Sequence, residues 1–102
     1  MVRKKRHKII WEDSALDYLV EQLEYVSQMS EDAPSIIKKG ILKNIQSVKA
    51  NPYVFEADKF KADNDGSYRA FVVYSYRVSY HITEKSVNII RVRHTSQDPV
   101  VY

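Results

Sequence analysis

The sequence predicts an α+β fold with the order β-α-α-β-β-β, in which a helical hairpin packs on one face of a small, mainly antiparallel sheet. Two segments, 13–28 and 32–51, carry apolar residues at steps of three and four, which is the spacing of amphipathic helices. Three later segments have the length and composition of strands, and turns of two and four residues separate them. A short β-branched and aromatic segment near the start adds one more strand.

The first strand is predicted at residues 7–11, where acidic residues follow Trp11 at once and indicate the start of a helix. Asp13 or Ser14 is placed to cap that helix. Its apolar stripe is expected to consist of Leu16, Leu19, Val20, Leu23 and Val26.

The second helix follows a connector at residues 29–32. Asp32 can cap this helix, and Pro34 suits its first turn, where the missing N–H of proline costs no hydrogen bond. Asn51 precedes a proline and is therefore expected to end the helix. The apolar stripe consists of Ile37, Ile41, Ile45 and Val48.

Three strands are predicted at residues 68–73, 76–82 and 87–94, after a polar segment whose strongest turn signal is Asp65-Gly66. Side chains alternate between the two faces of a strand. In the middle strand this period directs one set toward the helices: Tyr76, Val78, Tyr80 and Ile82. The opposite set is directed toward solvent: Arg77, Ser79 and His81. Residues 95–102 show no regular period and are expected to be extended or irregular.

Composition indicates one soluble domain over residues 1–102, with residues 1–6 as a flexible basic arm. The chain has no cysteine, which excludes disulfides and thiolate metal sites. No apolar run is long enough for a membrane span, so we expect a cytoplasmic protein without membrane contact. The three histidines lack the spacing of metal ligands, and no phosphate-binding glycine loop is present, so no metal or cofactor is expected.

The net charge of +3 is unevenly distributed. Residues 1–8 hold five basic and no acidic side chains, residues 9–58 hold four against nine, and residues 59–102 hold seven against four. A basic segment of this kind is typical of a polyanion-binding surface, because lysine and arginine displace counterions from phosphates. An ordinary solvated surface has the same composition, so charge alone leaves both readings open.

The basic residues of the C-terminal half fall on the predicted sheet and the segment before it. We expect strand periodicity to gather four arginines from three neighbouring strands on one face: Arg69, Arg77, Arg91 and Arg93. Lys59 and Lys61 precede the strands, and His81 and His94 lie close by. Guanidinium groups bind phosphates through paired hydrogen bonds, and tyrosine rings stack on unpaired bases. The combination predicts single-stranded RNA as one ligand for this face.

The strand sequences Tyr68-Arg69-Ala70-Phe71-Val72-Val73, Ser75-Tyr76-Arg77-Val78-Ser79-Tyr80 and Val87-Asn88-Ile89-Ile90-Arg91-Val92-Arg93-His94 resemble the C-terminal signature of the RelE/ParE toxin superfamily. These are the toxic halves of bacterial type II toxin-antitoxin pairs. The order of the preceding elements agrees, so the resemblance spans residues 7–98. It implies one of two activities: RelE-like members cut mRNA on the ribosome without metal, whereas ParE-like members inhibit DNA gyrase without that chemistry.

The resemblance also implies roles for particular residues. Arg77 matches an arginine that holds the scissile phosphate in RelE-like enzymes, and Arg69 lies near a lysine of that site. Tyr102 matches a tyrosine that stacks on and orients the substrate. His94 offers a titratable group for acid–base work.

Two positions depart from the RelE pattern. Ser96 stands where a catalytic arginine is expected, and Phe71 stands near the place of a second lysine.

Three readings follow. In the first, the chain is an mRNA endoribonuclease acting with the ribosome, in which Arg77, His94 and Tyr102 are catalytic. The RNA contacts would come from Arg69, Arg91, Arg93, Lys59 and Lys61. In the second, it is a ParE-like gyrase inhibitor, and in the third an inactive relic. All three imply a small antitoxin partner, encoded next door, that covers the basic face.

Overall fold

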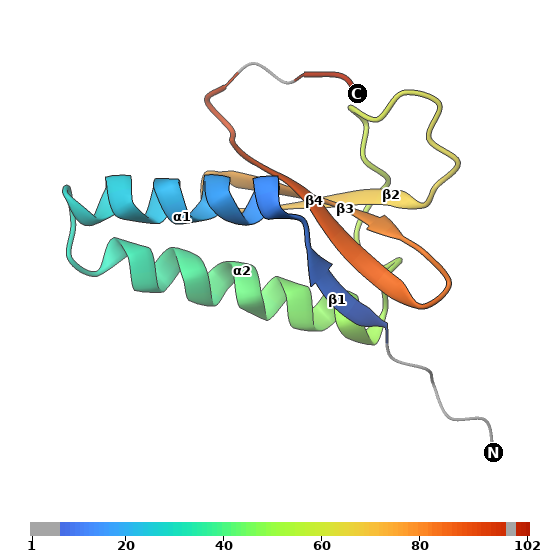
Figure 1. The fold of residues 1–102 in the computed structure, drawn as a ribbon, viewed down its shortest axis with the longest axis horizontal. Coiled ribbons are helices and arrows are strands. Elements are labelled where there is room, and N and C mark those ends of the chain that lie inside the picture. Colours follow the sequence, from blue (N-terminus) through green and yellow to red (C-terminus); the bar gives the residue numbers. More distant parts are fainter. Residues whose placement is uncertain (1–6, 98–99) are drawn as a thin grey trace.

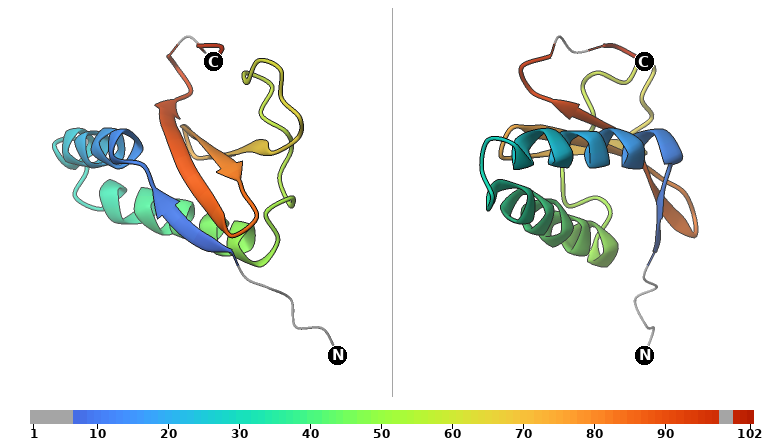
Figure 2. Two further views of the ribbon diagram at one scale, coloured as in Figure 1. Left: turned by 45° about the vertical axis from the view of Figure 1, so that its right-hand side comes forward. Right: turned by 60° about the vertical axis from the view of Figure 1, so that its left-hand side comes forward.

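The structure, a computed structural model, describes residues 7–97 and 100–102. The basic arm predicted at residues 1–6 lies outside the described residues. The two helices lie antiparallel on one side of a four-stranded sheet (Figures 1 and 2). The elements follow the predicted order: β1 (Lys8–Trp11), α1 (Asp13–Ser27), α2 (Ala33–Ala50), β2 (Tyr68–Val73), β3 (Tyr76–Ile82) and β4 (Ser86–His94).

The first helix turns a face to the core that is shifted from the predicted stripe: Leu19, Leu23 and Val26 pack in or against the core as predicted, but Leu16 and Val20 do not. Ala15 and Leu19 are buried, whereas Leu16 and Val20 are 43% and 46% exposed. Because α1 packs on both β4 and α2, its buried stripe runs through the small Ala15, which lets the helix approach its neighbours closely. The predicted cap at Asp13 or Ser14 is wrong, since Asp13 is already helical.

The second helix matches its prediction except at the cap, because Asp32 occupies the N-cap position but its side chain makes no capping hydrogen bond. Its four predicted stripe residues are buried, Pro34 lies in the first turn, and Asn51 follows the last helical residue. Gly40 allows close contact with the turn between β2 and β3. A Cβ atom at position 40 would lie 2.6 Å from a ring carbon of Tyr74, so a larger residue there would require the Tyr74 ring to move.

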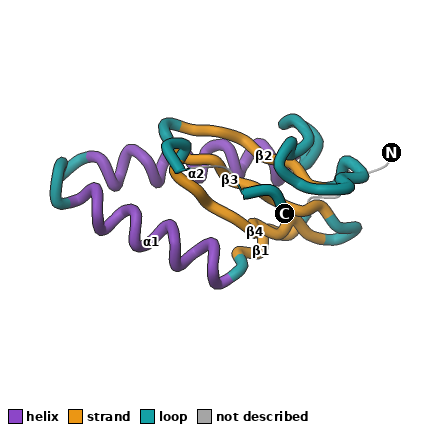
Figure 3. The backbone as a smooth tube through the Cα atoms, turned by 90° about the horizontal axis from the view of Figure 1, so that it is seen from above, coloured by secondary structure: helices purple, strands orange, loops and turns teal. Residues whose placement is uncertain are grey.

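The strand order across the sheet is β1-β4-β3-β2, as Figure 3 shows from above. The pairs β2–β3 and β3–β4 are antiparallel, and β1 pairs with β4 in parallel. A parallel pair needs a long crossover connection, which the helices and the hairpins supply here.

A β-bulge in β4 decides which of its side chains face away from the helices. Ser79 pairs with Arg91 and Tyr80 with Ile89, so Ile90 is an extra residue. Before the bulge, Val87 and Ile89 are buried; after it, Val92 is buried instead. Arg91 and Arg93 are thereby placed on the outer face, opposite Ser79 and Arg77 of β3. Strict alternation from Val87 would have turned both arginines toward the helices.

The core lies between the sheet and the helical hairpin. The middle strand contributes the side chains that the sequence predicts, and each is less than a tenth exposed: Tyr76, Val78, Tyr80 and Ile82. Tyr80 is fully buried, and its hydroxyl donates a 2.7 Å hydrogen bond to the carbonyl of Pro52, just after the end of α2. Burial raises the pKa of Tyr80 to about 12.

The outer face of the sheet is partly covered rather than open to solvent. The 53–67 loop and the 100–102 segment meet on this side, away from α2 (Figure 1). Backbone hydrogen bonds join them, from Tyr102 to Phe60 and from Ala62 to Tyr102. Ser79, predicted to face solvent, is only 3% exposed because these segments lie over it.

We predict that Tyr80→Phe lowers the free energy of unfolding by about 1–3 kcal/mol, because the Pro52 carbonyl is left buried without its donor. Urea denaturation should show a lower midpoint at an unchanged slope. Tyr74→Phe removes the same atom from a ring that is 60% exposed and should change little. Equal effects of the two substitutions would contradict the assignment.

Candidate functional site

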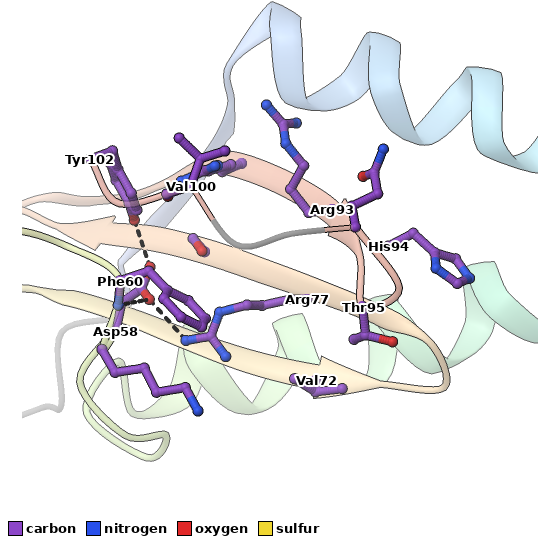
Figure 4. A pocket seen from close by; sticks show the side chains of 13 residues that line it. Asp58, Phe60, Val72, Arg77, Arg93, His94, Thr95, Val100 and Tyr102 are labelled. Atoms are coloured by element: carbon purple, nitrogen blue, oxygen red, sulfur yellow. Dashed lines mark hydrogen bonds and ion pairs between the residues drawn. The ribbon is translucent and has the colours of Figure 1, made fainter.

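A cavity of about 260 Å³ opens on the outer face of the sheet, beside the 100–102 segment. Figure 4 shows the side chains that line it. They include six of the residues that the sequence singled out: Lys59, Arg77, Arg91, Arg93, His94 and Tyr102. The structure therefore brings most of the predicted set to one place, although the side chains point in different directions.

The centre of this region is a residue that the sequence analysis missed. Asp58 is 2% exposed, and one carboxylate oxygen accepts hydrogen bonds from the Arg77 guanidinium at 2.8 Å and the Phe60 N–H at 3.1 Å. The other oxygen accepts from the Tyr102 hydroxyl at 2.6 Å. Figure 4 draws the three partners around the carboxylate. Asp58 stands among other acidic and basic residues of a polar segment, a pattern that does not predict burial.

The loop holds Asp58 in place through its backbone. The Asp58 N–H donates to the carbonyl of Tyr68, which attaches the loop to the edge of β2. The side-chain amide of Asn64 donates to the carbonyls of both Asp58 and Tyr68. The loop is therefore tied to the sheet on both sides of the carboxylate.

The contacts of Asp58 shift the pKa values of both acids in the cluster. Burial alone would raise the pKa of Asp58, but hydrogen bonds from Tyr102, Arg77 and the Phe60 N–H outweigh it and hold the pKa below the usual 3.8. Burial, the hydrogen bond to Asp58 and its negative charge raise the pKa of Tyr102 well above its ordinary value. The pair is thus a carboxylate and a neutral phenol at neutral pH.

The other two arginines of the cavity also have partners within the chain. Arg91 donates to the carbonyl of Val100 at 2.6 Å and lies over the ring of Tyr102, with its guanidinium carbon 4.7 Å from the ring centre. Arg93 donates to the Val92 carbonyl and lies over the ring of Tyr18 on α1. In Figure 4, Arg93 is directed toward α1 and away from Arg77.

Arg69 does not join this group, which corrects the expectation that four arginines share one face. It pairs with Tyr80, whose side chain is in the core, so Arg69 belongs to the helix side of the sheet. Its guanidinium donates to the carbonyls of Gly66 and Phe55 and lies over the ring of Tyr53. These contacts organise the loop.

The two lysines lie on the loop at different distances from the cavity. Lys59 lines it, with its ammonium group 5.3 Å from the centre of the Phe60 ring. Lys61 lies over the rings of Tyr68 and Tyr102 and borders a neighbouring hollow with His81.

His94 lies at the end of β4, with its ring edge-on to Tyr76 at 5.3 Å. The Ser96 N–H donates to its Nδ1 at 3.1 Å, and the Ser96 hydroxyl lies 2.7 Å from the same atom. Nδ1 is therefore an acceptor, which places the proton of the neutral ring on Nε2. Ser96, which occupies the position of the expected catalytic arginine, thus serves to orient the imidazole.

Within residues 7–97 and 100–102, no group of three or more potential ligands is arranged to hold a metal ion. The helices of that part of the chain are too short or too polar to span a bilayer.

The depressed pKa of Asp58 predicts an acid-sensitive contribution to stability. Because the folded state binds the proton less tightly than the unfolded state, this contribution is complete above the ordinary pKa and is lost as pH falls through the lower folded value. Asp58→Asn removes it. We expect the difference in unfolding free energy between wild type and variant to shrink as pH falls below 3.8; a pH-independent difference would contradict this.

Two comparisons with known proteins bear on the identity of the chain. The family model described as the ParE toxin of the type II toxin-antitoxin system, parDE, matches residues 9–99. The solved structure of the chromosomal ParDE toxin-antitoxin system from P. aeruginosa matches with a TM-score of 0.69, over 87% of this chain and 96% of that chain. Its sequence identity is 9%, so this likeness concerns the fold. No curated protein sequence matches.

The family match spans both helices and nearly the whole sheet, and the resemblance seen in the strand sequences points the same way. A toxin of such a system has a cognate antitoxin as its partner. The chain belongs to the ParE toxin family and is the toxin component of a type II toxin-antitoxin system.

Proposed function

We propose that this toxin arrests growth by inhibiting DNA gyrase, as a binding module that catalyses no reaction. The observation that carries the proposal is the match of the ParE family model over residues 9–99, because ParE-like members of the superfamily are the gyrase inhibitors. The proposed target requires the toxin to act in the cytoplasm, where gyrase works on DNA.

The contacts of the arginines support a non-catalytic role. RNA cleavage through the 2′-hydroxyl needs free cations for the charge that develops on phosphorus. The guanidinium of Arg77 is bonded to a buried carboxylate, and those of Arg91 and Arg93 are bonded to backbone carbonyls. Each guanidinium therefore has part of its five N–H donors committed to the chain and fewer of them left for a phosphate.

The candidate acid–base groups are also engaged. The Tyr102 hydroxyl donates to Asp58 and, with its raised pKa, does not lose its proton near neutral pH. Nδ1 of His94 accepts from Ser96, which leaves Nε2–H as the free side of the neutral ring. Neither group is therefore placed to act as a general base for the 2′-hydroxyl.

The alternative is an mRNA endoribonuclease that acts with the ribosome. One observation favours it, which is that Arg77, Arg91, Arg93, His94 and Tyr102 line the same cavity. This function would require the binding of mRNA and the ribosome to break the hydrogen bonds that Asp58 accepts from Arg77 and Tyr102.

The test is a supercoiling assay with relaxed plasmid, purified gyrase and ATP. We expect the toxin to abolish supercoiling in a dose-dependent way and the cognate antitoxin to restore it. Primer extension on mRNA from induced cells should show no new 5′ ends within codons. Unimpaired gyrase together with new 5′ ends would instead establish the nuclease.

A substitution at His94 separates the two readings in cells. His94→Gln keeps a polar side chain but cannot act as an acid or base near neutral pH. We expect induction of this variant to arrest growth as the wild type does, after circular dichroism has shown that it folds. Loss of arrest in a folded variant would support the nuclease and contradict the proposal.

A further inference from the structure

The helical hairpin separates its charges by helix. All four charged side chains of α1 are acidic and all four of α2 are basic: Asp13, Asp17, Glu21 and Glu24 on α1, and Lys38, Lys39, Lys43 and Lys49 on α2. Across the part of the chain that the structure describes, none of these eight takes part in an ion pair. The two helices lie side by side in Figures 1 and 3, so a negative and a positive row run along the hairpin.

Two apolar side chains of α1 lie on its flank toward α2. The opposite flank is fixed by Tyr18, whose hydroxyl accepts a hydrogen bond from the His94 N–H of β4. Leu16 and Val20 each stand two residues from Tyr18, which is about 200° around a helix, so they lie on the flank turned away from β4. Because α1 packs on β4 and α2 packs on β2, this flank faces α2.

One apolar side chain of α2 lies on the matching flank. Gly40 meets the turn between β2 and β3, where Tyr74 lies against it. Leu42 stands two residues further along α2 and so lies on the flank turned away from β2, toward α1. The exposed fractions of Leu16, Val20 and Leu42 are 43%, 46% and 43%. These three side chains, the apolar strip, therefore run between the two rows of charge.

Exposed charges border the apolar strip on each helix. Asp17 and Glu24 stand three residues before and four residues after Val20, so they share its face of α1. On α2, Lys39 stands three residues before the leucine of the strip, and Lys43 follows that leucine directly. All four charged side chains are exposed. The outward face of the hairpin thus carries an apolar strip with a negative border on α1 and a positive border on α2.

We propose that this face of the hairpin is a self-association surface, on which a second copy of the chain docks with the same face. A twofold axis parallel to the helices sets α1 of each copy on α2 of the other, so each acidic helix meets a basic one and the apolar strips meet at the centre. The hairpin turns between Ser27 and Ala33. Asp17 lies ten residues before this turn and Lys43 ten residues after it, so Asp17 is level with the partner's Lys43 in the dimer.

The size of the face sets the strength that we expect of this dimer. The helices of 15 and 18 residues are about 22–27 Å long, and each is about 10 Å wide. The face therefore covers about 500 Å² in each copy, and a dimer buries about 1,000 Å² in all, which is near the lower limit of specific interfaces. We expect a Kd in the micromolar range.

The test is sedimentation equilibrium of the purified full chain, with the charges of one helix reversed at a time. Asp17→Lys with Glu24→Lys makes α1 basic at the strip, and Lys39→Glu with Lys43→Glu makes α2 acidic there. Either pair sets like charges against each other across the twofold axis, and we expect the dimer Kd to rise by about tenfold or more. The fourfold variant restores opposite charges and the wild-type net charge, so its Kd should return to that of the wild type.

Glu56→Lys with Glu84→Lys is the matched control for net charge. Both glutamates are exposed and lie outside the hairpin, so this variant gains the same charge as the reversed α1 without changing the proposed face. We expect its Kd to equal that of the wild type. An equal rise in Kd for the control and for the reversed α1 would reduce the effect to net charge and overturn the proposal.

The salt dependence of the wild type keeps the proposal testable if circular dichroism shows that a reversed variant does not fold. Exposed charges are screened by salt, so we expect the dimer Kd to rise by about threefold or more between about 0.05 and 0.5 M NaCl. A wild-type chain that stays monomeric at about 1 mM, or a Kd that does not change with salt, would overturn the proposal. A monomeric wild type whose folded reversed variants lose the cognate antitoxin would assign the face to the antitoxin instead. None of these results depends on the gyrase assay.

Discussion

The carboxylate of Asp58 joins three parts of the chain that are remote in sequence. It accepts hydrogen bonds from Arg77 on the central strand, from the Phe60 N–H in its own loop, and from Tyr102. A buried charge is tolerated only when its partners satisfy it, so the loop, the strand and the 100–102 segment must adopt their positions together. Asp58 thus acts together with the backbone hydrogen bonds between Tyr102 and the loop to keep the outer face covered.

The contact between Asp58 and Arg77 also bears on the proposed activity. An enzyme that cleaves RNA on this face of the sheet needs free arginine N–H groups to hold the phosphate. In this chain Arg77 is neutralised by an internal anion, while Arg91 and Arg93 are bonded to backbone carbonyls. Membership of the ParE family and the engaged site therefore agree, because a gyrase inhibitor has no need of a scissile phosphate. The outer face retains its arginines, each of which has part of its N–H groups bonded within the chain.

Much of the fold could be predicted from the sequence because it depends on local periodicity. The strand boundaries at 68–73 and 76–82, and the buried stripe of α2, follow from apolar spacing alone. The first helix was less predictable, since a stripe through Ala15 has too little apolar signal to be distinguished from one through Leu16. Arg91 and Arg93 lie on the outer face because of a bulge at Ile90, which the residue pattern does not indicate.

The sequence predicts most of the residues that form the candidate site but not the contacts that these residues make. Six of the residues singled out line one cavity, while Arg69 lies on the other side of the sheet because it pairs with Tyr80. Asp58 could not be predicted, because its burial depends on a loop that folds over the sheet and on a segment more than forty residues further along the chain.

A double-mutant cycle tests most directly whether Asp58 and Tyr102 act as a unit. The unfolding free energies of wild type, Asp58→Asn, Tyr102→Phe and the double variant give the coupling between the two side chains. A hydrogen bond from a phenol to a buried carboxylate predicts a coupling of about 1 kcal/mol or more. Additive effects, within about 0.3 kcal/mol, would contradict the claim that this pair holds the outer face of the sheet closed.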